Sequence, residues 1–174
     1  MKKIFAVLLA AALCAGMLAG CGSKEPAASG DSVEMKEGQS IQTVVDQIID
    51  EVGIAMPAEI DDTLIKDVFY IDPEEDVDEY YGQFAMVNVS ADNLLGVKAK
   101  PERKDAVIEA MGKRLKDVQA SFANYLPDQS EKAQKGRVVD RGNYVFLIIL
   151  GDSPETFDDD LDRAVKIIDD AFAD

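Results

Sequence analysis

Cationic side chains gather in one short stretch of this chain, between residues 98 and 116. The chain as a whole is acidic, with 34 Asp and Glu against 18 Lys and Arg, and its formal charge is −16. A positive patch in such a chain could bind a small anion or an acidic protein partner. The alternative is that these cations pair with neighbouring acids as surface salt bridges of small energy. The seven cations are Lys98, Lys100, Arg103, Lys104, Lys113, Arg114 and Lys116.

Arg114 is the best single candidate for a binding residue. In the helix expected around it, Arg114 would lie about 60° around the axis from the apolar Met111, at the edge of the buried stripe. An arginine at that edge either extends over apolar surface or binds a carboxylate with both arms of its guanidinium group. We therefore predict a binding site at Arg114, together with the cations at 98, 100, 103 and 104.

Two acidic clusters could in principle hold a cation. The first cluster, between residues 72 and 79, lacks the alternating ligands, central glycine and terminal glutamate of an EF-hand loop. A solvated acidic turn is therefore the interpretation we favour. The second, Asp158 to Asp162, lies where the last helix begins, and the helix dipole favours negative charge there. We predict no metal site and no cofactor. The first cluster consists of Asp72, Glu74, Glu75, Asp76, Asp78 and Glu79.

The residue types needed for most enzyme mechanisms are scarce. The chain has no His, no Trp and two Cys. Ser90, Ser121 and Ser130 have no nucleophile-elbow motif around them. A pair of carboxylates could hydrolyse glycosides, but the sequence does not show whether any two face each other across a cleft. We predict no catalytic residues and no enzyme activity, with a cell-wall hydrolase as the least favoured alternative.

The N-terminus has the pattern of an exported, lipid-anchored protein. Lys2 and Lys3 precede an apolar run over residues 4–17, which is short for a membrane span and suits a signal peptide. The run ends in Leu18-Ala19-Gly20-Cys21, which resembles the lipobox of bacterial lipoproteins. The resemblance implies that Cys21 becomes the new N-terminus and carries the lipid, and two acyl chains anchor a protein stably. The expected location is the extracytoplasmic face of the cell membrane.

The remainder divides into a tether and one domain. Residues 1–20 are the expected signal peptide, residues 21–39 a polar, flexible tether, and residues 40–174 a single domain. A hydrophobic content of 47% is too high for a disordered acidic tail. The negative charge argues against nucleic-acid binding. Cys14 leaves with the signal peptide, so no intramolecular disulfide is possible and the core alone must stabilise the domain.

Apolar spacing predicts an α+β fold, in which an antiparallel sheet of about four strands packs against a long central helix, an N-terminal helix and a C-terminal helix. Two hairpins, at 80–100 and 138–150, would form the sheet, the first with one solvent-exposed edge. Residues 144–150 show no polar alternation, so both faces of that strand should be covered, by the first helix or by a partner. We favour the helix. The helices are expected at 41–52, capped by Ser40, at 61–68, from 101 to Pro127, at 128–135 and from 153 onward.

Three segments of the domain are similar to a family of Gram-positive lipoproteins. They are the run from Met86 to Lys98, the positions Arg114, Gln119, Phe122 and Tyr125 to Gln129, and Gly142 to Val145. That family is known only as domain of unknown function 4358, and the resemblance would cover residues 40–174. It implies a small exported domain and brings no catalytic residues.

The sequence therefore favours a lipid-anchored binding or interaction module. The alternative function is a solute-capturing accessory of a transport system. Such receptors usually close two lobes around a ligand, whereas this chain offers one domain.

Overall fold

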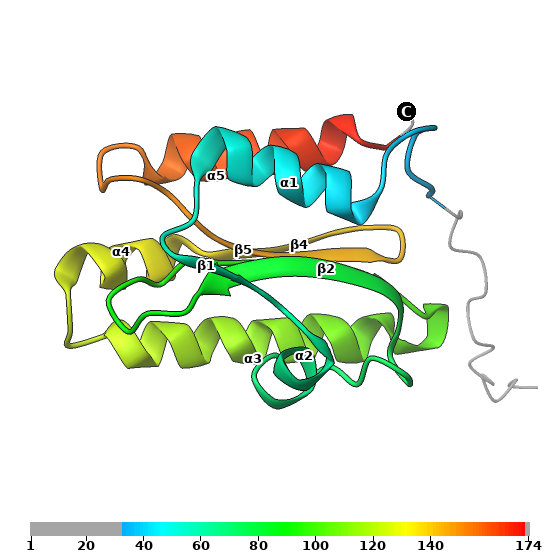
Figure 1. Cartoon of the computed structure of the whole chain (residues 1–174), viewed down its shortest axis with the longest axis horizontal. Helices are drawn as coiled ribbons and strands as arrows, with labels where there is room; N and C mark the ends of the chain where they lie inside the picture. The colour runs from blue at the N-terminus through cyan, green and yellow to red at the C-terminus, as the bar shows by residue number, and fades with distance from the viewer. Residues whose placement is uncertain (1–32, 173–174) are drawn as a thin grey trace, which may run out of the picture.

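A five-stranded antiparallel sheet forms the middle layer of the domain in the computed structural model, which describes residues 33–172 (Figure 1). The strand order is β1-β2-β3-β5-β4, so β3 and β5 are interior strands. The predicted α+β class is confirmed. The strands are β1 (Pro57–Glu59), β2 (Val77–Ala85), β3 (Asn93–Ala99), β4 (Arg137–Arg141) and β5 (Tyr144–Ile149).

Helices cover both faces of the sheet (Figure 1). Helices α1 (Ile41–Val52) and α5 (Phe157–Asp170) lie side by side on one face. The long helix α3 (Lys104–Phe122), which follows a 3₁₀ turn at Pro101–Arg103, lies on the other face with α2 (Asp62–Asp67). Helix α4 (Pro127–Lys135) packs beside the end of α3.

Strand β5 is buried on both faces, as its apolar run predicts. All six of its residues are buried. Phe146 and Ile148 pack in the core that α1 and α5 share, whereas Val145 and Leu147 pack in the core beneath α3. Helices α1 and α5 cover the second face together, so the expected N-terminal helix supplies only part of the cover.

Helix α1 begins and ends where the sequence predicts. The Ser40 hydroxyl accepts a hydrogen bond from the Thr43 amide at 3.1 Å, and the Thr43 hydroxyl accepts one from the Ser40 amide at 2.9 Å. These reciprocal bonds satisfy two amides that the first turn leaves free. Gly53, with φ of 90°, follows the last turn.

The first hairpin differs from its prediction in two respects. Its second strand, β3, is interior, so Gly96 is buried: a Cβ there would lie 2.7 Å from the Phe146 ring. Its first strand ends at Ala85, and residues 86–92 form a loop that exposes Met86 and Val89. The alternating valines at 87 and 89 resemble a strand but have no neighbouring strand to pair with.

The structure adds a fifth strand, β1, and ends the long helix five residues before the predicted limit at Pro127. Strand β1 pairs with the end of β2. It has only three residues, which is too short for an alternating pattern to be recognised in the sequence. Pro127 begins α4, because a proline is tolerated in the first turn of a helix, whereas α3 has already ended at Phe122.

Residues 33–36 pack on the domain and are named here the strap. The Glu34 carboxylate accepts hydrogen bonds from Tyr144 at 2.9 Å and Lys98 at 3.0 Å, and the Lys36 amide donates to the Ala171 carbonyl at 2.9 Å. The ordered domain therefore begins at least seven residues before the boundary at residue 40. The predicted signal peptide, Cys21 and residues 22–32 lie outside the described residues. Within the described part of the chain, no helix is both long and apolar enough to cross a membrane.

Candidate functional site

The two ends of the sheet have different surroundings. At one end, which we call the strap end, Val33 packs against Gly142 in the β4–β5 turn. At the other, the pocket end, the β2–β3 loop lies beside the last turn of α3 and helix α4 (Figure 1). Strand β3 runs from Asn93 at the pocket end to Ala99 at the strap end.

A cavity of about 390 Å³ opens at the pocket end, between the β2–β3 loop and α3. Its volume lies within the range of small-molecule sites. Arg114 is the one charged residue in its lining, so we name it the Arg114 pocket. The other lining residues are Phe84, Ala85, Val87, Asn88, Ser90, Asn93, Val118, Ser121, Phe122 and Tyr125.

The guanidinium group of Arg114 is held in place from two sides. Its Nε donates a hydrogen bond to Asn93 Oδ1 at 3.0 Å, and its central carbon lies 5.1 Å from the centre of the Phe69 ring. Asn93 is itself fixed, because its amide nitrogen donates to the carbonyls of Ala91 at 3.0 Å and Asp92 at 2.8 Å. A cation over a ring face is stabilised by the ring quadrupole. The chain thus orients this arginine without neutralising it.

Within residues 33–172, no carboxylate lies at ion-pair distance from Arg114. Asp117 is on the next turn of α3, but its carboxylate is taken by the Tyr70 hydroxyl at 2.6 Å and Lys113 at 3.0 Å. Those two hydrogen bonds, Tyr70 first, lower the pKa of Asp117. Burial lowers the pKa of the Arg114 guanidinium, because the charged form loses water. An arginine remains charged at neutral pH even so.

The other four predicted binding cations do not join Arg114. Lys104 precedes Arg114 by ten residues of α3, or about 15 Å along the helix axis. Three of the four pair with carboxylates, as the salt-bridge alternative describes, and the fourth, Lys100, donates to a backbone carbonyl. The contacts are Lys98 with the Glu34 carboxylate at 3.0 Å, Lys100 with the Glu74 carbonyl, Arg103 with the Asp76 carboxylate at 2.7 Å and Lys104 with the Asp140 carboxylate at 2.6 Å.

A buried ion pair supports the floor of the pocket end. Lys132 of α4 donates to Asp92 at 2.6 Å, and the two residues are 5% and 3% exposed. The second carboxylate oxygen of Asp92 accepts from the Ala55 amide at 2.9 Å, and the Gln129 side chain accepts from the Ala91 amide at 2.9 Å. These bonds fix the turn that carries Asn93. Sequence reasoning missed the pair, because its members are 40 residues apart and no local pattern links them.

Apolar side chains extend the surface of the pocket end beyond the cavity. Met86 is 66% exposed and Val89 52% exposed, and both belong to the loop that lines the Arg114 pocket. Tyr125 is 49% exposed on the opposite side of the opening. We call these three residues the rim. Large apolar side chains gathered beside a pocket are typical of a surface that binds a partner.

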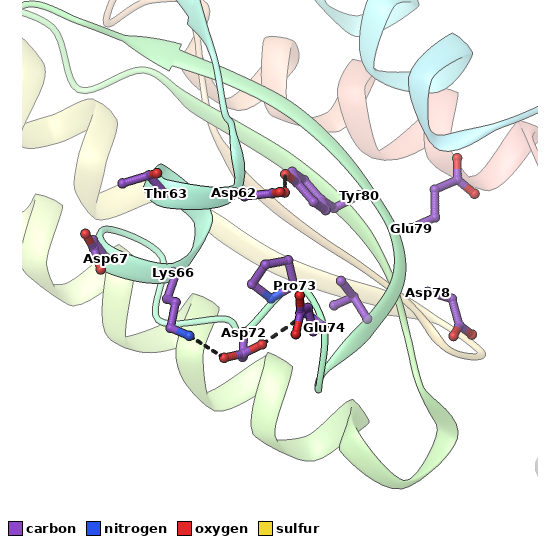
Figure 2. Close-up of a pocket in the computed structure, with 11 residues that line it drawn as sticks. Asp62, Thr63, Lys66, Asp67, Asp72, Pro73, Glu74, Asp78, Glu79 and Tyr80 are labelled. Carbon is purple, nitrogen blue, oxygen red and sulfur yellow. Dashed lines mark hydrogen bonds and ion pairs between the residues drawn. The ribbon is translucent and has the colours of Figure 1, made fainter.

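A larger hollow of about 720 Å³ lies beside α2 and is lined by acids (Figure 2). Two of its carboxylates, those of Asp62 and Asp72, are engaged by other groups of the domain. Figure 2 shows Lys66 beside Asp72 at 2.6 Å, and the Tyr80 hydroxyl donating to Asp62. The Lys66 hydrogen bond, followed by the amides of Glu75 and Glu74, lowers the pKa of Asp72. No three acidic residues of the described chain are arranged to hold a metal ion. The acidic cluster is a capped turn in this structure.

Comparison with known proteins gives one result. No curated protein and no solved structure matches the chain. A family described as a domain of unknown function (DUF4358) matches residues 50–150, which is more than half of the chain. The matched range contains the β2–β3 loop, Arg114 and α4. On this match, the chain belongs to the DUF4358 family.

Proposed function

We propose that this protein is a lipid-anchored, extracytoplasmic binding module, without a cofactor, whose Arg114 pocket takes the carboxylate of an apolar anion or protein partner. The observation that carries the proposal is a half-buried arginine, oriented by Asn93 and Phe69, with no carboxylate partner among the described residues. Burial removes part of the water around this charge, the attraction of the nearby Asp117 offsets only part of that loss, and a bound anion would supply a direct partner.

The charge in the pocket favours a monoanion. Arg114 supplies one positive charge, and the remainder of the lining is apolar or uncharged polar. The chain carries a net charge of −16, so its long-range field repels anions. A phosphate dianion would bring a second negative charge, for which the lining has no further cation. One carboxylate, which a guanidinium group binds through two parallel hydrogen bonds, fits a single arginine best.

The position of the strap supports a binding site that faces away from the membrane. If Cys21 carries acyl chains, the tether enters the domain at the strap end, and the Arg114 pocket lies at the opposite end of the sheet. The 12 residues from Cys21 to Val33 would hold the domain roughly 20 Å from the bilayer as a flexible coil. A partner outside the membrane could then reach the pocket.

The two other functions have less support. A solute receptor that closes two lobes would place its ligand between them, whereas one domain forms the Arg114 pocket. A glycoside hydrolase needs a carboxylic acid with a raised pKa. The pKa values of Asp72 and Asp117 are shifted in the opposite direction.

Titration of the full chain in detergent with benzoate tests the pocket. Benzoate is an apolar monocarboxylate, and we expect it to shift the amide resonances of Asn93 and Ser90. Arg114→Gln should weaken binding at least about tenfold, because hydrogen bonds to charged groups contribute about 1.5–3 kcal/mol. Lys116→Gln, an equal change of charge at an exposed position on the same helix, is the matched control. Equal affinity in both variants would refute the proposed pocket.

The anchor is tested separately. The intact mass of the native protein should correspond to a chain that begins at an acylated Cys21. Cys21→Ser should release the protein from the membrane fraction. An unmodified chain that still begins at Met1 would refute the anchoring part of the proposal and would leave the pocket untouched.

A further inference from the structure

We propose that the natural occupant of the Arg114 pocket is the C-terminal residue of a peptide or protein chain, with an apolar side chain and a free carboxylate. This inference rests on the proposed function and specifies its ligand. Three observations lead to it: the free edge of the guanidinium group, the absence of acids from the pocket lining, and the apolar rim.

The guanidinium group offers one complete edge to a ligand. Nε is occupied by Asn93 Oδ1, whereas the two terminal nitrogens make no hydrogen bond to a side chain or carbonyl of residues 33–172. Since every buried side-chain nitrogen of the described residues has a partner, these two nitrogens are open to solvent and therefore accessible to a ligand. These two nitrogens form the edge that binds a carboxylate through parallel hydrogen bonds. The contacts with Asn93 and Phe69 fix the direction of that edge before a ligand arrives, so little ordering entropy is lost on binding.

The pocket lining favours the C-terminus of a peptide over a free amino acid as the ligand. No Asp or Glu lines the Arg114 pocket. The ammonium group of a free amino acid would therefore lose water without gaining a counter-charge. In a peptide, the same nitrogen is a neutral amide. Asn88, Ser90 and Ser121 in the lining carry the donors and acceptors that a peptide group needs.

The lining and the rim fit the apolar parts of such a ligand. Phe84, Val118 and Phe122 give the pocket its apolar wall, which suits the last side chain of the peptide. A small carboxylic acid would lie entirely within the cavity, whereas a peptide would extend out of it. Val87 and Ser90 line both the Arg114 pocket and a neighbouring hollow of about 460 Å³, which the exposed Val89 also lines, so the preceding residues of a peptide would pass from the pocket across this loop.

Three related probes test the carboxylate and the neutral nitrogen: N-acetylphenylalanine, its C-terminal amide and free phenylalanine. We expect N-acetylphenylalanine to bind at least about tenfold more tightly than either of the others, because the amide lacks the carboxylate and phenylalanine carries an unpaired ammonium group. If benzoate binds but phenylalanine matches N-acetylphenylalanine, the inference is overturned and the proposed function stands. If no carboxylate binds, both are overturned.

A longer probe tests the rim. N-acetyl-Ala-Ala-Phe should bind several times more tightly than N-acetylphenylalanine. The double variant Met86→Ser/Val89→Ser should remove that gain and leave N-acetylphenylalanine binding unchanged. An unchanged gain in the double variant would overturn the path across the rim, and the absence of any gain in the unaltered protein would overturn the assignment to a peptide.

A second variant keeps the test independent of the stability of Arg114 variants. Ser121 is exposed on α3 and lines the pocket, so Ser121→Trp should fill the opening while Arg114 stays in place. We expect this variant to lose binding of benzoate, N-acetylphenylalanine and N-acetyl-Ala-Ala-Phe, with thermal unfolding measured in parallel. Unchanged binding would show that the ligand occupies another site.

Discussion

Lys98 and Arg114 are two half-buried cations whose surroundings differ in one respect. Each lies near an aromatic ring: the Lys98 amine is 5.2 Å from the centre of the Tyr144 ring, and the Arg114 guanidinium carbon is 5.1 Å from that of Phe69. Lys98, near the strap end of β3, also has the Glu34 carboxylate at 3.0 Å. Arg114, bound to the first residue of β3, has only an amide oxygen.

The two pKa shifts follow from this difference. The pKa of Lys98 is raised, mainly by its hydrogen bond with Glu34, whereas burial lowers the pKa of Arg114. The strap end therefore neutralises its own cation and is complete as it stands. The pocket end holds an oriented cation beside an opening and leaves the counter-charge to a ligand. A cation is a better candidate for binding when the fold positions it without pairing it.

The largest expected effect comes from the ion pair beneath the pocket end. Lys132→Met leaves the buried Asp92 carboxylate without a counter-charge, and we expect the free energy of unfolding to fall by about 3–5 kcal/mol. Urea unfolding measures this loss. Adding Asp92→Asn should restore part of it, because the charge is gone. A loss below about 1 kcal/mol for the single variant would mean that water solvates the carboxylate.

Arg114→Gln and Lys98→Gln should show opposite patterns. For Arg114→Gln we expect at least a tenfold loss of benzoate affinity, with a change in unfolding free energy below about 1 kcal/mol, because the lost hydrogen bond is offset by removing a desolvated charge. Lys98→Gln should leave benzoate binding unchanged. Calorimetric titration measures the benzoate affinity of both variants, and urea unfolding measures their free energy of unfolding. A binding loss in Lys98→Gln would remove the distinction between the two ends.

The sequence allowed the layers of the fold to be predicted, because they depend on local periodicity. The apolar run of β5 indicated that both faces were covered, and the stripe of α1 indicated what covers one of them. Strand β1 could not be predicted from the sequence, because its three residues become a strand only by pairing with β2. The loop after Ala85 was misjudged, since Val87 and Val89 alternate as a strand would.

The candidate site could be predicted only in part. Helical geometry placed Arg114 at the edge of the buried stripe, where the structure has it. Its lack of a carboxylate partner depends on how Asp117 is used by Tyr70 and Lys113, and only tertiary contacts decide that. The sequence suggested one patch of cations, but the structure does not bring them together, because ten residues of helix separate Lys104 from Arg114.

The strap should stabilise the domain moderately without affecting the pocket. Met35 is half-buried against the α1–α5 core and forms a β-bridge with Phe172. Met35→Ala should reduce the free energy of unfolding by about 1 kcal/mol, less than the 2–5 kcal/mol of a fully buried methionine. Benzoate affinity should not change. A change in affinity would show that the strap end and the pocket end are coupled.

The smallest expected effect is the pH dependence of the Glu34–Lys98 pair. The pKa of Glu34 is lowered from 4.5, mainly by its hydrogen bonds with Lys98 and Tyr144, so its stabilising contribution is present above pH 4.5 and is lost as the pH falls through the lowered pKa. The pKa of Lys98 is raised from 10.5, so the stabilising contribution of its charged amine is fully present below pH 10.5. That contribution is lost as the pH rises through the raised pKa of the folded state.

Wild type and Glu34→Gln should therefore differ by a constant amount between these limits, and the difference should vanish in acid. The pair is partly exposed, with side chains 28% and 58% accessible, so solvent screening limits the difference to a few tenths of a kcal/mol. Urea unfolding at pH 3, 5 and 8 measures it. A difference that grows as the pH falls would mean that Glu34 is not the acceptor that neutralises Lys98, and the strap end would then resemble the pocket end.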